Sequence, residues 1–282
     1  TLAGAVAPVK TPNDKHVSHS IAERVGIKTL ACIAGIKRAA VFGADCKAAL
    51  RRLINGKAVV RKQDFSAALL EAGAQALPIV SLISFMVGLI LAFVGAVQLK
   101  MFGAQIFVAS LVAIAMSRVM GAIMTGILMA GRTGASYAAV LGAMQVNEET
   151  DALETMGVSP YDFLVLPRLL ALSIMMPLLT IYSDLTSILG GAFVGVFMLD
   201  LTPAEYFNMT LQSLSTKNIV IGLVHSCVFG VIVSLCGCYF GMKCERNASA
   251  VGAATTAAVV YSIVWIIVAT AIITYICSGM GL

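Results

Sequence analysis

Long apolar runs separated by short polar segments fill most of the chain after residue 76. The first run, 77–99, holds 23 residues without a charge, enough for an α-helix to cross about 30 Å of hydrocarbon. Similar runs recur along the chain, and we expect spans at about 77–99, 103–131, 167–199, 218–242 and 257–278. The pattern predicts an all-α, polytopic helical membrane protein with about five transmembrane helices.

Two segments of different character precede the first run. Residues 1–20 contain Pro8, Pro12 and the polar stretch NDKHVSHS, which predicts a flexible N-terminal tail. Residues 21–62 are too charged to span a membrane and too apolar to lie free in water, so we expect an interfacial amphipathic helix. A soluble helical hairpin is the alternative for this segment. The transmembrane domain would then comprise residues 63–282.

The composition and the distribution of charge support a membrane protein with a defined orientation. Hydrophobic residues make up 59% of the chain, and the mean hydropathy is +0.94. Twelve of the 19 Lys and Arg residues lie at or before Lys62, which places the N-terminus in the cytoplasm by the positive-inside rule. Five crossings then place the C-terminus on the opposite, periplasmic side. The connections that carry Arg132, Arg168, Lys243 and Arg246 fall on the cytoplasmic side.

Other chemistry has little support in the sequence. His16 and His19 have HxxH spacing, but in a flexible tail we expect them to be solvated rather than to bind a metal. The seven cysteines form no CxxC pair, and we expect reduced, buried small side chains. No aromatic or nucleic-acid motif accompanies the basic segment, so we expect no nucleic-acid partner. The cysteines are Cys32, Cys46, Cys227, Cys236, Cys238, Cys244 and Cys277.

Two charges lie deep in the expected spans. Arg118 lies 14 residues before Arg132, and Asp184 lies 16 residues after Arg168, which places both roughly 21–24 Å from the cytoplasmic ends of their spans. An unpaired charge there would cost at least about 2.5–3.5 kcal/mol. We therefore expect the two to face the bundle interior and to interact, directly or through water. The alternative is local: Arg118 reaches the interface, and Asp184 is satisfied by hydroxyls of Ser183, Thr186 or Ser187.

One polar stretch, NEETDALETMG at 147–157, concentrates acidic residues between two apolar runs. Four of the 14 acidic residues, Glu148, Glu149, Asp151 and Glu154, fall within seven positions. Asn147 is a suitable N-cap and Gly157 a suitable left-handed C-terminal cap, so the stretch predicts a short helix. A helix this short is unstable alone in water and requires a docking partner.

The expected helix has two distinct faces. One carries Glu148, Asp151 and Thr155, and the other carries Glu149, Leu153 and Met156. A short solvated helix that merely joins two spans is the alternative, but it gives no reason for exposed apolar residues beside four acids. The pattern favours docking on a cytoplasmic partner.

The sequence around this stretch resembles a known family. AGRTGASYAAVLGAMQVNEETDALETMGVSPYDFLVLPRLLA at 130–171 closely resembles the central block of the MlaE family of ABC-transporter permeases, which has an AGR-x-G turn, a DALE-x-MG helix and a PR-LL-A re-entry into the membrane. The resemblance extends to VGLILAFVGAVQ (87–98), MMPLLTIYSDLTSILGG (175–191) and GAATTAAVVYS (252–262). It covers roughly residues 25–280.

The resemblance implies a homodimeric, non-catalytic permease in the bacterial inner membrane, driven by two copies of a separate cytoplasmic ATPase that binds ATP and Mg. It implies transport of phospholipids or related lipids to or from a periplasmic carrier of the MCE type. The acidic stretch would be the coupling helix, seated in a groove of the ATPase. Its candidate residues are Glu148, Glu149, Asp151, Leu153, Glu154, Met156 and Gly157. The chain has no G-x-x-x-x-G-K-[ST] loop, so we expect no cofactor in this chain.

Two positions depart from the family pattern. The family usually has an Arg-Glu-Leu-Gly-Pro-like run in the second span, where this chain has RVMGA, with Val119 at the Glu position. A second family Glu corresponds to Val140. These losses leave the coupling block unchanged.

The first span supplies candidates for a lipid path at a dimer interface. They are Met86, Leu89, Leu91, Phe93, Val94 and Gln98. Gly88, Ala92 and Gly95 would let another helix approach closely. A channel or secondary transporter for a small solute is the alternative function, but such proteins need polar residues along several spans. Here only Arg118, Asp184 and His225 are available, and we expect His225 to be a hydrogen-bonded packing residue.

Overall fold

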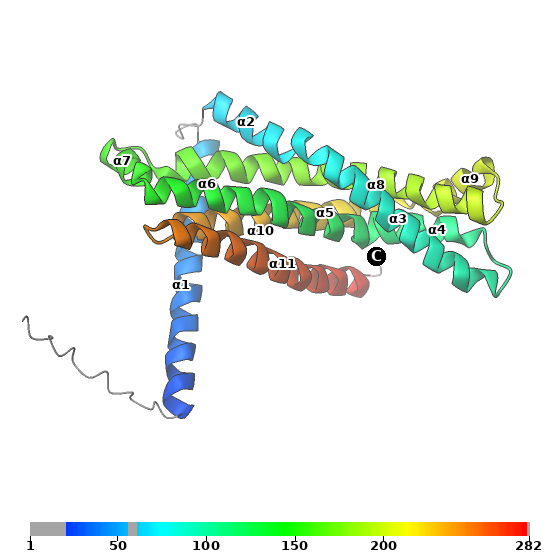
Figure 1. The fold of residues 1–282 in the computed structure, drawn as a ribbon, viewed down its shortest axis with the longest axis horizontal. Helices are drawn as coiled ribbons and strands as arrows, with labels where there is room; N and C mark the ends of the chain where they lie inside the picture. The colour runs from blue at the N-terminus through cyan, green and yellow to red at the C-terminus, as the bar shows by residue number, and fades with distance from the viewer. Residues whose placement is uncertain (1–20, 56–60, 281–282) are drawn as a thin grey trace, which may run out of the picture. The chain divides into compact units, whose positions relative to one another are not determined.

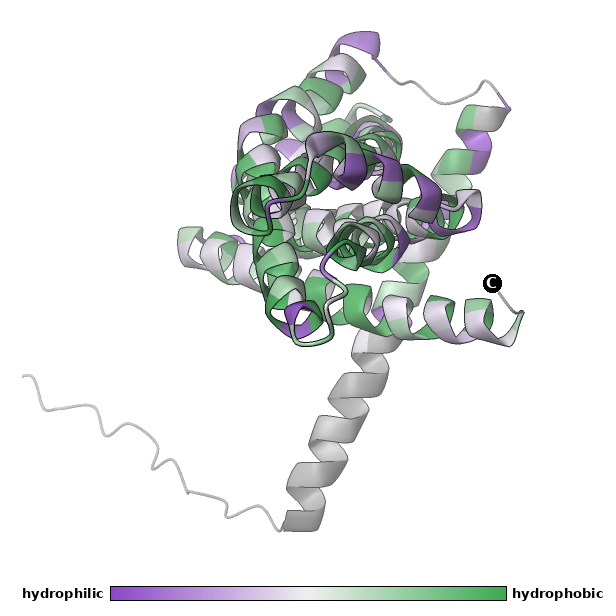
Figure 2. Ribbon diagram, turned by 90° about the vertical axis from the view of Figure 1, so that its right-hand side faces the viewer, coloured by the Kyte–Doolittle hydropathy of each residue, from purple (hydrophilic) through white to green (hydrophobic). Residues whose placement is uncertain are grey.

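The computed structural model describes residues 21–55 and 61–280, and within these ranges the chain is helical, without a strand. Five helices in the described part are long and apolar enough to cross a membrane: Lys62–Lys100, Phe107–Val146, Tyr161–Met198, Thr216–Met242 and Ala248–Gly279. The all-α membrane fold and the number of spans are confirmed. Hydrophobic residues predominate along these helices (Figure 2), and many large hydrophobic side chains on them are exposed, as expected for contact with lipid.

The chain divides into two compact units, Thr1–Phe42 and Gly43–Leu282. The helix α1 (Ile21–Ile54) runs through the boundary between them. The interfacial-helix prediction for 21–62 therefore corresponds to one helix that ends at Ile54, followed by α2 (Lys62–Ala72). The predicted tail 1–20, with His16 and His19, lies outside the described residues.

The first span is built from α2, the short 3-10 helix η1 (Ala74–Ala76) and α3 (Leu77–Lys100). Helix α3 packs closely on α8 (Leu166–Met198) because glycines face the partner backbone on both sides. A Cβ on Gly88 would overlap the Ser187 backbone, and a Cβ on Gly190 would overlap the Phe85 carbonyl. The predicted close approach at Gly88 is confirmed, and the partner is α8 of the same chain.

The second span is a continuous helical run from α4 (Phe107–Ala115) to α6 (Ala135–Val146), with α5 (Gly121–Met129) between them. Two π-helical segments interrupt its α-helical pattern: η2 (Met116–Met120) and η3 (Ala130–Gly134). The helix therefore does not end near residue 131, where the sequence predicts the end of the span. The AGRTG sequence forms a π-helical segment instead of a turn, so the helix continues for another twelve residues as α6.

The remaining elements are α7 (Glu149–Thr155), the π-helical segment η4 (Tyr161–Val165), α8, α9 (Pro203–Ser213), α10 (Thr216–Met242) and α11 (Ala248–Gly279). Helix α10 packs against α8, α6 and α11, so it lies at the centre of the bundle. The short helices α7 and α9 lie at opposite ends (Figure 1), which we name the α7 end and the α9 end.

The connection between α8 and α10, at the α9 end, contains the unpredicted helix α9. Thr202 caps α9: its Oγ1 accepts from the Glu205 N–H at 3.3 Å, and the Glu205 carboxylate accepts from the Thr202 N–H at 3.0 Å. Pro203 occupies the first helical position. Threonine, proline and glutamate at these spacings are a capping box with an N1 proline, a signal that the sequence carried.

Candidate functional site

The acidic stretch forms the short helix α7 between α6 and η4, at one end of the bundle. Helix α6 ends at Val146 with Asn147 as its C-cap, and Glu148 adopts a left-handed backbone, with φ 58° and ψ 18°, at the N-cap of α7. The predicted N-cap Asn147 is therefore wrong by one residue. Its side-chain amide instead donates to Glu149 Oε1 at 3.4 Å. The left-handed residue redirects the chain between two helices that have no loop between them.

The other end of α7 follows the prediction. Gly157 has φ 76°, its N–H donates to the Glu154 carbonyl at 3.0 Å, and the Val158 N–H donates to the Leu153 carbonyl at 3.0 Å. These two bonds form a Schellman motif, which requires a left-handed residue and therefore favours glycine. The predicted C-terminal cap at Gly157 is confirmed.

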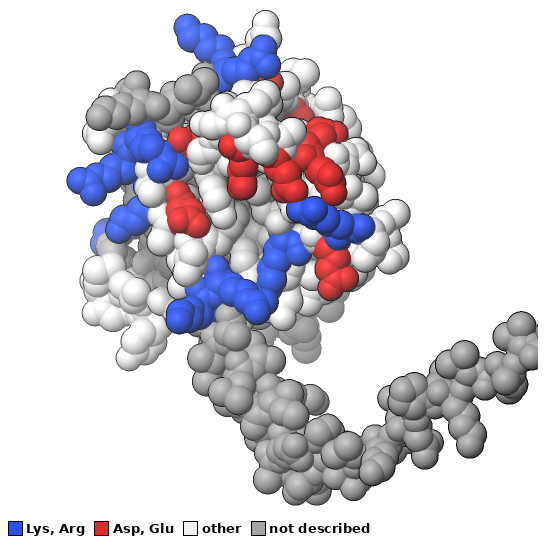
Figure 3. Space-filling view, turned by 90° about the vertical axis from the view of Figure 1, so that its left-hand side faces the viewer, with Lys and Arg blue, Asp and Glu red and all other residues white. Residues whose placement is uncertain are grey.

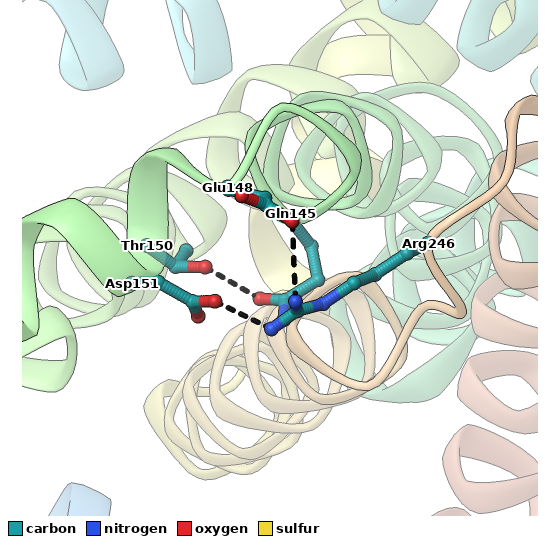
Figure 4. A network of polar contacts seen from close by, with 5 residues as sticks. All are labelled: Gln145, Glu148, Thr150, Asp151 and Arg246. Carbon is teal, nitrogen blue, oxygen red and sulfur yellow. Dashed lines mark hydrogen bonds and ion pairs between the residues drawn. The ribbon is translucent and has the colours of Figure 1, made fainter.

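One face of α7 is bound within the chain. Arg246, in the connection between α10 and α11, lies 3.3 Å from Glu148 Oε1 and 2.5 Å from Asp151 Oδ2 (Figure 4). Beside this pair, the buried Thr150 hydroxyl donates to Gln145 Oε1 of α6 at 2.7 Å. Glu148 and Asp151, predicted to share a face, thus bind one guanidinium, and Thr150 ties the helix to α6.

The other face of α7 is open. Glu149, Glu154 and Met156 are exposed, with Met156 retaining 68% of its accessible surface, and Leu153 is half-buried. Acidic side chains gather over this end of the molecule, beside basic ones (Figure 3). A large apolar side chain next to exposed carboxylates is suited to a protein surface with an apolar pocket and basic surroundings.

A second ion pair lies just after α7. The Arg52 guanidinium of α1 binds both carboxylate oxygens of Asp162 in η4, with Nε 2.9 Å from Oδ2 and Nη2 2.6 Å from Oδ1. The Asp162 side chain is only 13% exposed, and its hydrogen bond with Arg52 raises the Arg52 pKa above the ordinary value. The pair joins α1 to the start of the third span. No local pattern in the sequence predicts this pair, because the two residues lie 110 positions apart.

Both intramembrane charges lie near the second span. Arg118 in η2 donates from Nη1 to Asn218 Oδ1 at 3.1 Å, so it reaches the first turn of α10. The Asp184 Oδ1 atom is buried without a hydrogen-bond partner, and a Cβ on Gly121 would overlap it. Gly121 directly follows η2, so the predicted similar depth of the two charges agrees with the packing. Their direct or water-mediated pairing stays a prediction.

The alternative prediction, that nearby hydroxyls satisfy the Asp184 carboxylate, is wrong for its Oδ1 atom. The Ser183 hydroxyl bonds the Ser84 hydroxyl at 2.7 Å, and the Ser187 hydroxyl donates to the Asp184 backbone carbonyl at 2.9 Å. The Thr186 hydroxyl donates to the carbonyls of Tyr182 and Ser183. The hydroxyls are used within and between helices, and the carboxylate oxygen is left without one.

The lipid-path candidates separate into two groups. Met86, Phe93, Val94 and Gln98 are exposed on α3. Leu89 and Leu91 instead pack against a core cluster that α3 shares with neighbouring helices. That cluster consists of Ala92, Ala96, Val108, Val112, Met116, Val194 and Leu199.

A cavity of about 410 Å³ between α3 and α8 was not predicted. Its lining residues are Pro78, Ser81, Leu82, Phe85, Thr186 and Leu189. The Ser81 hydroxyl bonds the Tyr182 hydroxyl at 2.6 Å, so the lining offers mainly apolar surface. Finding this cavity requires the pairing of α3 with α8, which no local pattern in the sequence specifies.

Metal-binding and thiol chemistry gain no support. Among the described residues, no group of His, Cys, Asp and Glu side chains could hold a metal ion. The six described cysteines are free; Cys46, Cys238, Cys244 and Cys277 are buried, but Cys236 is half-buried and Cys227 exposed, so the expectation of burial was wrong for two. His225 is buried, with Nδ1 2.8 Å from the Ile221 carbonyl, as predicted for a packing residue.

Comparisons with known proteins agree with these features. The family model described as Permease MlaE matches residues 65–276. A probable ABC transporter permease protein of Rickettsia bellii is 34% identical over 255 residues, covering 90% of this chain and 96% of that protein. A similar protein of Rickettsia conorii is 38% identical over 206 residues, covering 73% of this chain and 80% of that protein. The chloroplastic protein TRIGALACTOSYLDIACYLGLYCEROL 1 of Arabidopsis thaliana is 31% identical over 199 residues, covering 71% and 57%.

Proposed function

Because the chain belongs to the MlaE family of ABC transporter permeases, we propose that it moves phospholipids or related lipids between the bacterial inner membrane and a periplasmic carrier of the MCE type. As a multi-pass permease, it works with a separate ATPase. In the proposed assembly two copies of the chain form a homodimer, and two ATPase subunits bind ATP and Mg. The N-terminus and α7 lie in the cytoplasm, and the C-terminus lies in the periplasm.

The open face of α7 is the observation that supports this proposal best. It presents Leu153 and Met156 beside Glu149 and Glu154, on a helix too short to be stable alone. The Schellman motif and the contacts to Arg246 and α6 hold the helix in place before a partner binds. A preformed, partly apolar helix that connects the second and third spans is suited to transmit a conformational change of an ATPase to both spans.

Three further observations support lipid as the cargo. The name of the Arabidopsis relative is that of a galactolipid, trigalactosyldiacylglycerol. The cavity between α3 and α8 is lined mainly by apolar side chains, which suit an acyl chain. Exposed apolar residues of α3 and α11, among them Phe93, Val264 and Trp265, offer surfaces for lipid or for a second copy of the chain.

One purification tests both parts of the proposal. The full chain is purified with the ATPase that accompanies it, and retained lipids are identified by mass spectrometry. We expect phospholipid in the complex, and loss of the ATPase from the double variant Leu153→Asp/Met156→Asp. Thr155→Asp is the control, because it places a new carboxylate on the other face of α7. An ATPase that stays bound to the double variant overturns the coupling assignment, and lipid-free complex that conducts a small solute favours the channel alternative.

A further inference from the structure

Arg246 lies between the N-terminal ends of two helices. It directly precedes Asn247, the N-cap of α11, whose Oδ1 accepts from the Ala250 N–H at 2.7 Å. On its other side lie Glu148 and Asp151, at the N-terminal end of α7. A cation near a helix N-terminus is disfavoured by the helix dipole, whereas carboxylates there are favoured. The two acids therefore compensate a charge that would otherwise destabilise the start of α11.

The backbone that carries Arg246 is anchored on both sides. Cys244 is buried, and a Cβ on Gly142 of α6 would lie 3.5 Å from its Cβ and Sγ atoms. Asn247 fixes the other side through its capping bond. Arg246 therefore moves with α11 and α6 when these helices move, and it is not a free surface side chain (Figure 4).

The ion pairs are accessible to water in the isolated chain. The side chains of Arg246 and Asp151 are 55% and 44% exposed, so water screens their attraction. A partner that covers α7 would exclude part of this water and strengthen the interaction. A seated ATPase would in this way strengthen the contact between α7 and the start of α11.

We propose that Arg246 is a positioning residue of the coupling segment. It holds the face of α7 that carries Glu148 and Asp151, so that the opposite face, with Glu149, Leu153 and Met156, meets the ATPase. It also transmits the motion of α7 to α11. This inference rests on the proposed function. It divides the acidic stretch by role: Glu148 and Asp151 bind within the chain, and Glu149 and Glu154 remain for the partner. The motion of α7 would then reach the last span as well as the third.

Charge exchange in the assembled complex tests the proposal. The variants are Arg246→Glu, Arg246→Lys and the swap Arg246→Asp/Asp151→Arg. Lys243→Glu is the matched control, since it makes the same charge change in the same connection, where the Lys243 ammonium contacts Tyr239 Oη at 3.3 Å instead of α7. The complexes are reconstituted in vesicles with fluorescent phosphatidylethanolamine. Bound ATPase, lipid transferred per ATP hydrolysed and hydrogen exchange of α7 amides are measured.

For Arg246→Glu we expect bound ATPase, lipid transfer per ATP reduced about fivefold, and faster exchange in α7. The swap should recover at least about half of the transfer, and Arg246→Lys should lie between them. Equal values for Arg246→Glu and Lys243→Glu, or a swap no better than the single reversal, overturn the proposal. If Arg246→Glu does not assemble, recovery of assembly by the swap supports the pairing, and failure of the swap rejects it.

The two proposals fail in different ways. An ATPase that stays bound to Leu153→Asp/Met156→Asp removes the coupling assignment itself. If the ATPase is lost from that double variant but Arg246→Glu behaves like the unmodified chain, the proposed function stands. Only the role of Arg246 is then rejected. Hydrogen exchange of α7 gives an answer even if the fluorescent lipid is not a substrate.

Discussion

Arg52 and Asp162 form a bidentate ion pair that joins α1 to the residues just after α7, with contacts of 2.9 and 2.6 Å. Asp162 directly follows the first residue of η4, which leads into the third span. The segment that contains α7 is therefore held at two places by arginines distant in sequence: Arg246 binds at the start of the helix, and Arg52 binds after its end.

Reversing the charge at Arg52 should loosen the end of α1. In Arg52→Glu, the partly buried Asp162 would face a like charge, and we expect amide exchange over residues 43–54 to rise about fivefold. Mass spectrometry of hydrogen exchange in the purified complex measures this. Arg51→Glu, an exposed neighbour, is the control. The swap Arg52→Glu/Asp162→Arg should restore slow exchange, and no restoration would contradict the pairing.

The α3–α8 contact should not tolerate a methyl group at its closest point. In Gly88→Ala the new Cβ overlaps the Ser187 backbone, and we expect the free energy of unfolding to fall by about 1–3 kcal/mol. The midpoint of thermal aggregation in detergent should fall. Gly252→Ala is the control, because a Cβ there meets no atom within 4 Å. Equal midpoints for the two variants would show that α3 and α8 pack differently.

Asp184 and Gly121 should be coupled sterically. Gly121→Ala places a Cβ on the Asp184 Oδ1 atom, and we expect it to reduce the yield of folded protein. Asp184→Ala should relieve that defect in the double variant. Asp184→Asn alone should not produce this defect, since its side chain is nearly the same size and Gly121 still has no Cβ. A double variant worse than Gly121→Ala would rule out the steric coupling.

The left-handed backbone at Gly157 should contribute to ATPase binding. Gly157→Ala has room for its Cβ but is strained at φ 76°, at a cost of about 1 kcal/mol. We expect the affinity for the ATPase to fall about fivefold, measured by binding to the chain in nanodiscs. Gly157→Asn should retain most of the affinity, because asparagine tolerates this conformation. Equal weakening by both substitutions would mean that space, not backbone conformation, matters there.

The cap of α9 should depend on pH. Hydrogen bonds from the Thr202 N–H and hydroxyl lower the pKa of Glu205 below its ordinary value of 4.5. A depressed folded-state pKa means that the stabilisation is present above the unfolded pKa and is lost as the pH falls through the folded value. We expect amides at the start of α9 to lose protection as the pH falls below 4.5, after correction for intrinsic exchange. Glu205→Gln should show no such transition, and its persistence there would assign it to another group.

The five spans were predictable because each needs only a long run of apolar residues, which is a local property of the sequence. The continuation of the second span through AGRTG was not. Two glycines in five residues suggest a turn, but a Cβ at Gly134 would lie 3.1 Å from Val233 Cγ1, and the Gly134 carbonyl lies against Gly237. The contact with α10 determines the conformation here, and a local pattern does not contain it.

In the candidate site, too, features set by local sequence were predictable, and features set by distant contacts were not. The Gly157 cap was predictable, since its hydrogen bonds lie within six residues. The start of α7 at Glu148 was not, because Glu148 is bound by Arg246, 98 positions away. The α9 cap is a different case: its signal is local, and it was present in the sequence as Thr202-Pro203 and Glu205.

Each π-helical segment among the described residues contains one charged side chain: Arg118 in η2, Arg132 in η3 and Asp162 in η4. A π turn spaces its hydrogen bonds one residue further apart than an α turn, so it acts as a one-residue insertion in a helix. Each residue of an α-helix turns it by about 100°, so relatives with a plain α-helix would need a gap there for equivalent faces to coincide. Val119 lies inside one such segment and Val140 just beyond another, so an alignment gap at either would change which residue is compared with the family's glutamates.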